Sequence, residues 1–192
     1  MKKVIVILLV LALCLSFVSC KAEKVIEDKN VPASNTTETV ENTPAPIPQN
    51  DDALKLAREG KITGLSIQIG SKLQDAVAQL GEPIGFDNFE GVSYVSYEVI
   101  DLMLDKIIED TKSEANISGI IMSEGYELYG VKVGMSPAQI KVMLGTPTQE
   151  LLETDAEGDM WKMDYDCGEY LLSFYSADKD TATVSAYLSK KQ

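Results

Sequence analysis

Histidine is absent from the 192 residues of this chain, and cysteine and tryptophan are scarce, with three and one residues. Without histidine there is no Ser-His-Asp or Cys-His catalysis and no histidine-based zinc site, and the commonest general base is missing. The glycines form no phosphate-binding loop of the G-x-x-x-x-G-K-[ST] type. The sequence therefore predicts a protein that is not an enzyme, with no catalytic residue, no metal site and no cofactor.

The three cysteines supply no disulfide framework. Cys14 lies in an apolar N-terminal run, Cys20 ends that run, and Cys167 is the remaining thiol. Cys167 stands in a strand-like stretch with no histidine to activate it, which favours a packing role over a nucleophilic one.

Positive charge is also scarce: 17 Lys and Arg stand against 30 Asp and Glu, for a formal net charge of −13. The excess of acidic residues lies in residues 51–192. An acidic surface repels phosphate backbones and is typical of a protein kept soluble outside the cell. The composition therefore excludes nucleic acid as the expected partner.

The N-terminus, MKKVIVILLVLALCLSFVSC, has two lysines followed by an apolar run over residues 4–18. This is the pattern of a signal peptide, and the run is short for a membrane span, which needs about 20 residues. Its end resembles the bacterial lipobox, with Phe17 where leucine is usual and a small residue before Cys20. The resemblance implies a lipoprotein signal over residues 1–20, with Cys20 acylated and the protein on the extracytoplasmic face of the cell membrane. The alternative is ordinary secretion with cleavage after a small residue.

Residues 21–50 are rich in Pro, Thr, Asn and Glu and lack apolar periodicity, which predicts a disordered tether. As a flexible coil, such a segment spans a root-mean-square distance of roughly 30 Å. The globular domain is expected over residues 51–192.

Two stretches of that domain read alike: residues 64–83 are GLSIQIGSKLQDAVAQLGEP, and residues 129–147 are YGVKVGMSPAQIKVMLGTP. Each begins with alternating apolar residues that predict a strand, Ile67 and Ile69 in the first and Val131 and Val133 in the second. Each continues with helical spacing and ends in Leu-Gly-x-Pro, a helix stop. The predicted helix faces comprise Leu73, Ala76, Val77 and Leu80 in the first stretch, and Ile140, Met143 and Leu144 in the second.

Strand-like alternation follows each of these stretches, around Val95 and around Met163, and the last strands begin near Ile117 and Val184. The pattern predicts an α+β fold in which two units, at about 61–123 and 126–190, each contain a strand, a helix and an antiparallel sheet. A unit of about 65 residues has a marginal core, so the two copies are expected to pack together.

The run LKLAREGKITGLSIQIGSKLQDAVAQLGEP, with the later VGMSPAQIKVMLGTP, resembles the YjgB-like lipoproteins of Gram-positive bacteria, a family defined by a domain of unknown function. The phrase of glycine, Ser or Thr, helix and Leu-Gly-x-Pro is similar to the tandem repeat of beta-lactamase inhibitory proteins and of BamE/SmpA-type lipoproteins. These resemblances imply an extracytoplasmic, two-repeat, non-enzymatic module and supply no catalytic residues.

Aromatic residues on the predicted strands are the candidates for a binding surface. If the two sheets form one concave surface, Tyr94, Trp161 and Lys162 are the candidate binding face, because interface energy concentrates on aromatic-rich surfaces. Strand alternation places Tyr94 and Tyr97 on opposite faces.

The favoured function is a lipid-anchored binding or scaffold module whose partner is an envelope protein or a cell-wall component. One alternative is a protein inhibitor of a cell-wall or lactam-recognising hydrolase. The other is a carboxylate-dependent enzyme acting on cell-wall sugars, which requires two buried carboxylates that face each other across a cleft.

Overall fold

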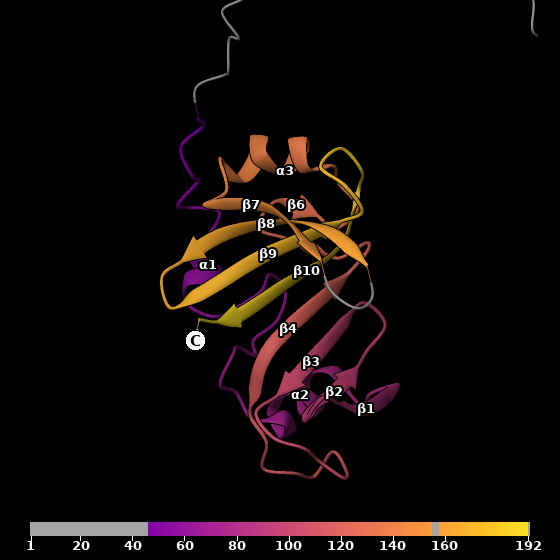
Figure 1. Cartoon of the computed structure of the whole chain (residues 1–192). Coiled ribbons are helices and arrows are strands. Elements are labelled where there is room, and N and C mark those ends of the chain that lie inside the picture. Colours follow the sequence, from indigo (N-terminus) through magenta and orange to yellow (C-terminus); the bar gives the residue numbers. More distant parts are fainter. Residues whose placement is uncertain (1–45, 155–157, 192) are drawn as a thin grey trace, which may run out of the picture. The chain divides into compact units, whose positions relative to one another are not determined.

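The structure is a computed structural model that describes residues 46–154 and 158–191. The predicted signal peptide, Cys20 and all but the last residues of the predicted tether lie outside the described residues. The described domain is dominated by one antiparallel sheet of eight strands (Figure 1).

The sheet runs in the order β1-β2-β3-β4-β10-β9-β8-β7. Its strands are β1 (Gly85–Phe89), β2 (Val92–Ser96), β3 (Ile100–Leu104), β4 (Ile117–Ser123), β7 (Gln149–Thr154), β8 (Asp159–Cys167), β9 (Tyr170–Ser176) and β10 (Thr183–Lys190). A separate two-stranded sheet pairs β5 (Glu127–Leu128) with β6 (Val131–Lys132). Consecutive strands β1 to β4 and β7 to β10 thus form two meanders, which join where β4 pairs with β10.

The helices are short: α1 (Lys55–Arg58), α2 (Leu73–Leu80) and α3 (Pro137–Leu144). Local signals set the bounds of α2 and α3. Ser136 caps α3 in a reciprocal capping box with Gln139, and glycines with φ near +85° end both helices, at Gly81 and Gly145. The predicted positions of these two helices and their glycine stops are confirmed.

A row of fully buried side chains crosses six neighbouring strands on the helix side of the sheet. Its members are in register from strand to strand: Val95, Leu102, Ile120, Leu188, Leu172 and Tyr165. Helical residues such as Ala57, Leu73 and Ile140 are buried in the same core cluster. The core is therefore a single layer between one sheet and the short helices.

The predicted α+β fold, a tandem repeat of two strand-helix-antiparallel-sheet units like that of beta-lactamase inhibitory protein, is wrong. The structure is mostly one continuous eight-stranded sheet, and the three helices of the described residues have four, eight and eight residues. Ile67 and Ile69 are buried, but they lie in an irregular segment between Gly64 and Gly70, both with positive φ. Apolar alternation here reflects burial without a strand ladder, because the left-handed glycines turn the chain at both ends.

The segment Ile47 to Asn50, at the end of the predicted tether, lies along the C-terminal end of α3. The Thr146 N–H donates to the carbonyl of Ile47 at 2.8 Å, and the Asn50 N–H donates to that of Leu144 at 2.9 Å. We call residues 47–50 the strap. The strap thus joins the C-terminal end of α3 to a segment almost one hundred residues earlier in the sequence.

Within the described residues, every helix is too short, or not apolar enough, to cross a membrane.

Candidate functional site

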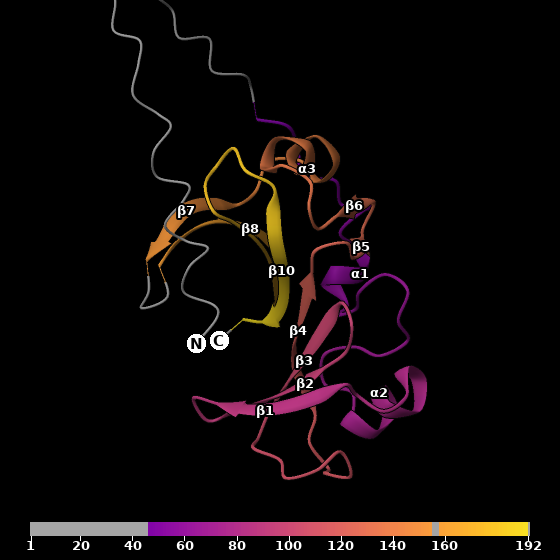
Figure 2. The same ribbon diagram turned by 90° about the vertical axis from the view of Figure 1, so that its right-hand side faces the viewer.

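One face of the eight-stranded sheet carries no helix from the part of the chain that the structure describes, and we call it the open face. Figure 2 shows the helices on one side of the sheet, while β1 and β7, its two end strands, both curve toward the other side. The open face is therefore concave, and Figure 1 looks onto it. Strand alternation places on it the residues that lie between the buried core positions.

Three tyrosines form a row across the middle of this face: Tyr94 on β2, Tyr187 on β10 and Tyr175 on β9, all half-buried. Gly119 on β4 makes room for Tyr187, because a Cβ at Gly119 would lie 2.7 Å from the Tyr187 ring and hydroxyl. Burial raises the pKa of Tyr187, and the nearby phenols of Tyr94 and Tyr175 raise it further against a hydrogen bond with Ser189. The two other phenols of the row thus lie near enough to Tyr187 to influence its pKa.

The row ends at Lys162 on β8, whose Nζ lies 5.7 Å from the centre of the Tyr175 ring. The same Nζ lies 3.6 Å from the Asp164 carboxylate and 3.9 Å from that of Glu153. Asp164 is buried and accepts a 2.6 Å hydrogen bond from the Ser173 hydroxyl. Burial lowers the pKa of Lys162, but Tyr175, Asp164 and Glu153 raise it more, so its ammonium is held charged.

The structure brings two of the three predicted face residues together and separates the third. Tyr94 and Lys162 both lie on the open face. Trp161, the neighbour of Lys162, points to the helix side, where it packs against the core. Its indole N–H is buried and has no hydrogen-bond partner among residues 46–154 and 158–191. Tyr97 also packs on the helix side, opposite to Tyr94 as the alternation predicted.

The carboxylate-dependent alternative requires two buried carboxylates that face each other, so the buried carboxylates of the described residues bear on it. Asp164 is the one buried carboxylate among them, and it is paired with Lys162. No three carboxylates or thiols of the described residues converge to hold a metal ion. Cys167 is fully buried, and burial raises its pKa to about 11, which keeps it an unreactive thiol at neutral pH.

Sequence reasoning missed Tyr187, Asp164 and Ser173 as parts of this site. The alternation in β10 carried a signal for Tyr187, because it lies between buried Ala186 and Leu188 and must point the other way. No local signal marks Gly119 as its neighbour, since the two residues lie on strands from different meanders.

No protein-family model matches the chain, and no curated protein matches it. A solved structure of a DUF4309 family protein, YjgB from Bacillus subtilis, is similar to it, with 21% identity over 73% of this chain and 95% of that one, and a TM-score of 0.52. The likeness confirms, at the level of fold alone, the resemblance to YjgB predicted from the sequence.

Two other solved structures are less alike. A cysteine-rich secretory protein from Staphylococcus aureus has a TM-score of 0.44 and 12% identity over 64% of this chain and 44% of its own. An extracellular protein containing an SCP domain, from Bacillus anthracis, has a TM-score of 0.47 and 9% identity over 87% of this chain and 50% of its own. The chain thus spans about half the length of these two proteins.

Proposed function

We propose that this domain is a non-enzymatic binding module that binds an envelope protein through its open face. The observation that carries the proposal is the tyrosine row, Tyr94, Tyr187 and Tyr175, on a concave sheet face free of helices. Tyrosine gives large contact area at a low cost in conformational entropy, and it is enriched where binding energy concentrates.

The electrostatics of the face support a protein partner over a sugar polymer. Lys162 is already neutralised by Asp164 and Glu153, so the β8 end of the row holds paired charges that suit a polar protein surface. The inhibitor and the carboxylate-enzyme alternatives stay predictions of the sequence, and for the enzyme the single buried carboxylate lacks the facing partner that its mechanism needs.

A crosslinking experiment in intact producing cells tests the proposal. The unchanged full chain, the double variant Tyr94→Ala with Tyr175→Ala, and the control Val142→Ala are compared. Val142 lies on α3 and is 69% exposed, away from the open face. We expect one envelope protein to be captured by the unchanged chain and by the control and to be lost with the double variant. Equal capture by all three chains would place the binding site elsewhere.

The proposal also includes an anchor at Cys20 on the extracytoplasmic face of the cell membrane. We expect Cys20→Ala to move the protein from the membrane fraction to the medium, because a single acylated cysteine is the only attachment proposed. Retention of the variant in the membrane fraction would contradict the anchor and leave the binding proposal untouched.

A further inference from the structure

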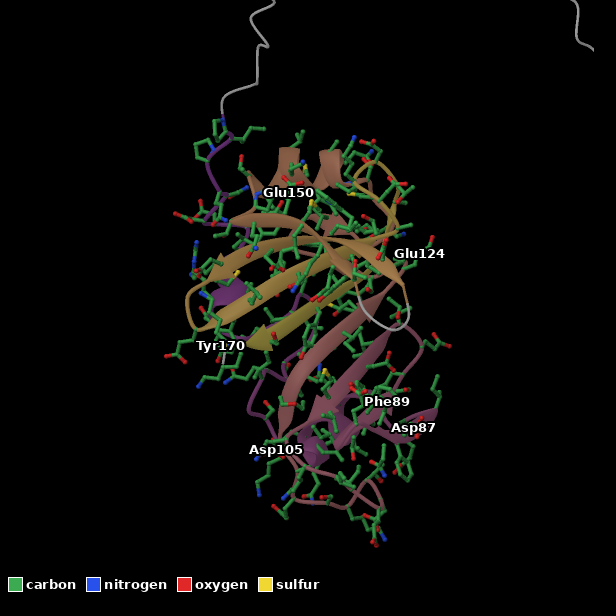
Figure 3. The ribbon with its side chains drawn as sticks, viewed as in Figure 1. Asp87, Phe89, Asp105, Glu124, Glu150 and Tyr170 are labelled. Atoms are coloured by element: carbon green, nitrogen blue, oxygen red, sulfur yellow. The ribbon has the colours of Figure 1, made fainter. Side chains whose placement is uncertain are left out.

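The edge strand β1 and the residue before it expose three large apolar side chains. Ile84, Phe86 and Phe89 are 73%, 46% and 55% exposed. Figure 3 shows Phe89 and its neighbour Asp87 on this strand, at the outer edge of the sheet. Phe86 and Phe89 point to opposite faces of the strand, so apolar surface is exposed on both sides of this edge.

The hairpin at Glu90 and Gly91 determines which backbone groups of β1 face outward. Both residues have positive φ, 50° and 83°, as a two-residue hairpin turn requires. The turn makes Phe89 and Val92 a hydrogen-bonded pair. Because hydrogen-bonded and non-hydrogen-bonded pairs alternate along an antiparallel ladder, Asn88 and Phe86 lie in non-hydrogen-bonded pairs. Their N–H and C=O groups therefore point away from β2. An outward row of this kind is a template for another strand.

A carboxylate covers part of that template. The Asn88 N–H donates to Oδ1 of Asp87 at 2.7 Å, so one of the outward donors is occupied within the chain itself. A carboxylate has two oxygens with several acceptor sites, so Asp87 can also attract a cation on a strand that lies alongside β1. The negative charge of Asp87 therefore favours a basic residue opposite it and disfavours an acidic one.

We propose that the free edge of β1 adds one extended strand from a partner protein that carries lysine or arginine opposite Asp87 and apolar residues beside Phe86 and Phe89. Charge complementarity identifies this occupant, since the net charge of the chain is −13 and the strand centre is acidic. A second copy of this chain fits poorly. If two copies pair antiparallel through the outward groups of both strands, Phe86 of each copy lies opposite Asn88 of the other. This register sets the two Asp87 side chains opposite each other, and two like charges in that position are destabilising. This edge adjoins the tyrosine row at Tyr94, which pairs with Asp87 across β1 and β2, and it lies four strands or more from Tyr175.

The test uses the full chain and three synthetic peptides. The first is Leu-Val-Lys-Val-Thr, the second has glutamate in place of lysine, and the third is the lysine peptide with alternate backbone nitrogens methylated. Amide hydrogen exchange at Phe86 and Asn88 reports main-chain pairing, and a titration followed by NMR gives the affinity. We expect the lysine peptide to slow exchange at both amides, the glutamate peptide to bind roughly two- to fivefold more weakly, and the methylated peptide to give no protection.

Two variants and two controls sharpen the result. Asp87→Lys should reverse the preference between the lysine and glutamate peptides. Phe86→Pro should abolish binding, because proline is tolerated on an edge strand where its nitrogen faces solvent but cannot donate. The controls Val142→Ala and Tyr175→Ala should bind the lysine peptide as the unchanged chain does, so that failure at this edge is distinguishable from failure at the open face.

Three results would overturn the proposal: equal binding of the lysine and methylated peptides, an unchanged preference in Asp87→Lys, or no protection of either amide by any peptide. Self-association of the unchanged chain that Phe86→Pro removes would make a second copy the occupant and would also overturn it.

Discussion

The ring of Tyr187 on β10 lies against the backbone of Gly119 on β4, with the ring and hydroxyl 2.7 Å from the position that a Cβ would take. This contact crosses the line where the two meanders join. The residue without a side chain thus sets where the central tyrosine of the open face lies.

Gly119→Ala should lower the free energy of unfolding by about 1 to 3 kcal/mol, because the added methyl overpacks the contact with Tyr187. Gly85→Ala is the matched control, since Gly85 lies on β1 with no heavy atom within 4 Å of a new Cβ. Urea denaturation should show the control unchanged or slightly more stable. The double variant Gly119→Ala with Tyr187→Ser should lose less free energy of unfolding than the two single variants lose together, because the smaller side chain removes the overpacking.

Lys162→Met should lower the free energy of unfolding by about 3 kcal/mol, because it leaves the buried carboxylate of Asp164 without its cation. The Ser173 hydroxyl still donates to Asp164 in this variant. Adding Asp164→Asn removes the stranded charge and should recover part of the loss. Chemical denaturation of the single and double variants measures this, and a single-variant loss below about 0.5 kcal/mol would show that the pair behaves as an exposed one.

Gly81 and Gly145 end their helices with the same φ, +85°, but their surroundings differ. A Cβ on Gly145 would lie 2.2 Å from the carbonyl oxygen of Pro48, whereas one on Gly81 meets no heavy atom within 4 Å. Gly81→Ala should therefore cost about 1 to 3 kcal/mol for the backbone alone, because φ +85° with ψ −170° is a conformation essentially confined to glycine. Gly145→Ala should cost more and should speed amide exchange at Asn50 and Thr146. Equal losses of unfolding free energy in the two variants would mean that the strap moves away from a new Cβ at Gly145 without destabilising the domain.

Stability should fall as pH rises from about 9 toward 11, the interval between the ordinary pKa of a cysteine thiol and that of Cys167, which burial raises to about 11. The unfolded chain loses its thiol proton first, so the stability that the protonated thiol contributes is present below pH 9 and is lost through this interval. Unfolding monitored at several pH values should show a smaller loss for Cys167→Ala. An identical alkaline loss would assign the effect to buried tyrosines such as Tyr165, whose pKa burial also raises.

The helices could be predicted because their signals are local. Ser136, Pro137 and the glycine stops act on the backbone within a few residues, and that information is in the sequence itself. The pairing of β4 with β10 joins segments some sixty residues apart, and no local pattern specifies it. This pairing turned two expected units into one sheet, and it is the reason that the predicted fold class failed.

The candidate site shows the same division. Tyr94 and Lys162 could be predicted from aromatic and basic residues on alternating strands, and the structure places both on the open face. The sequence also showed that Trp161 and Lys162 could not both lie on the open face, because consecutive residues of a strand point to opposite faces. The burial of Asp164 against Lys162 and Ser173 depends on the register of β8 and β9, which only the fold supplies.

The strap gives the domain a directional mechanical response. Its backbone bonds, Thr146 to Ile47 and Asn50 to Leu144, lie one behind the other along the chain that enters from the N-terminal side. We expect a pull from that side to load the Ile47 bond before the Asn50 bond, because Ile47 comes first along the chain. Tension at the entry point would lengthen the linker by a few residues and be relieved there before it reached the ladder of the eight-stranded sheet.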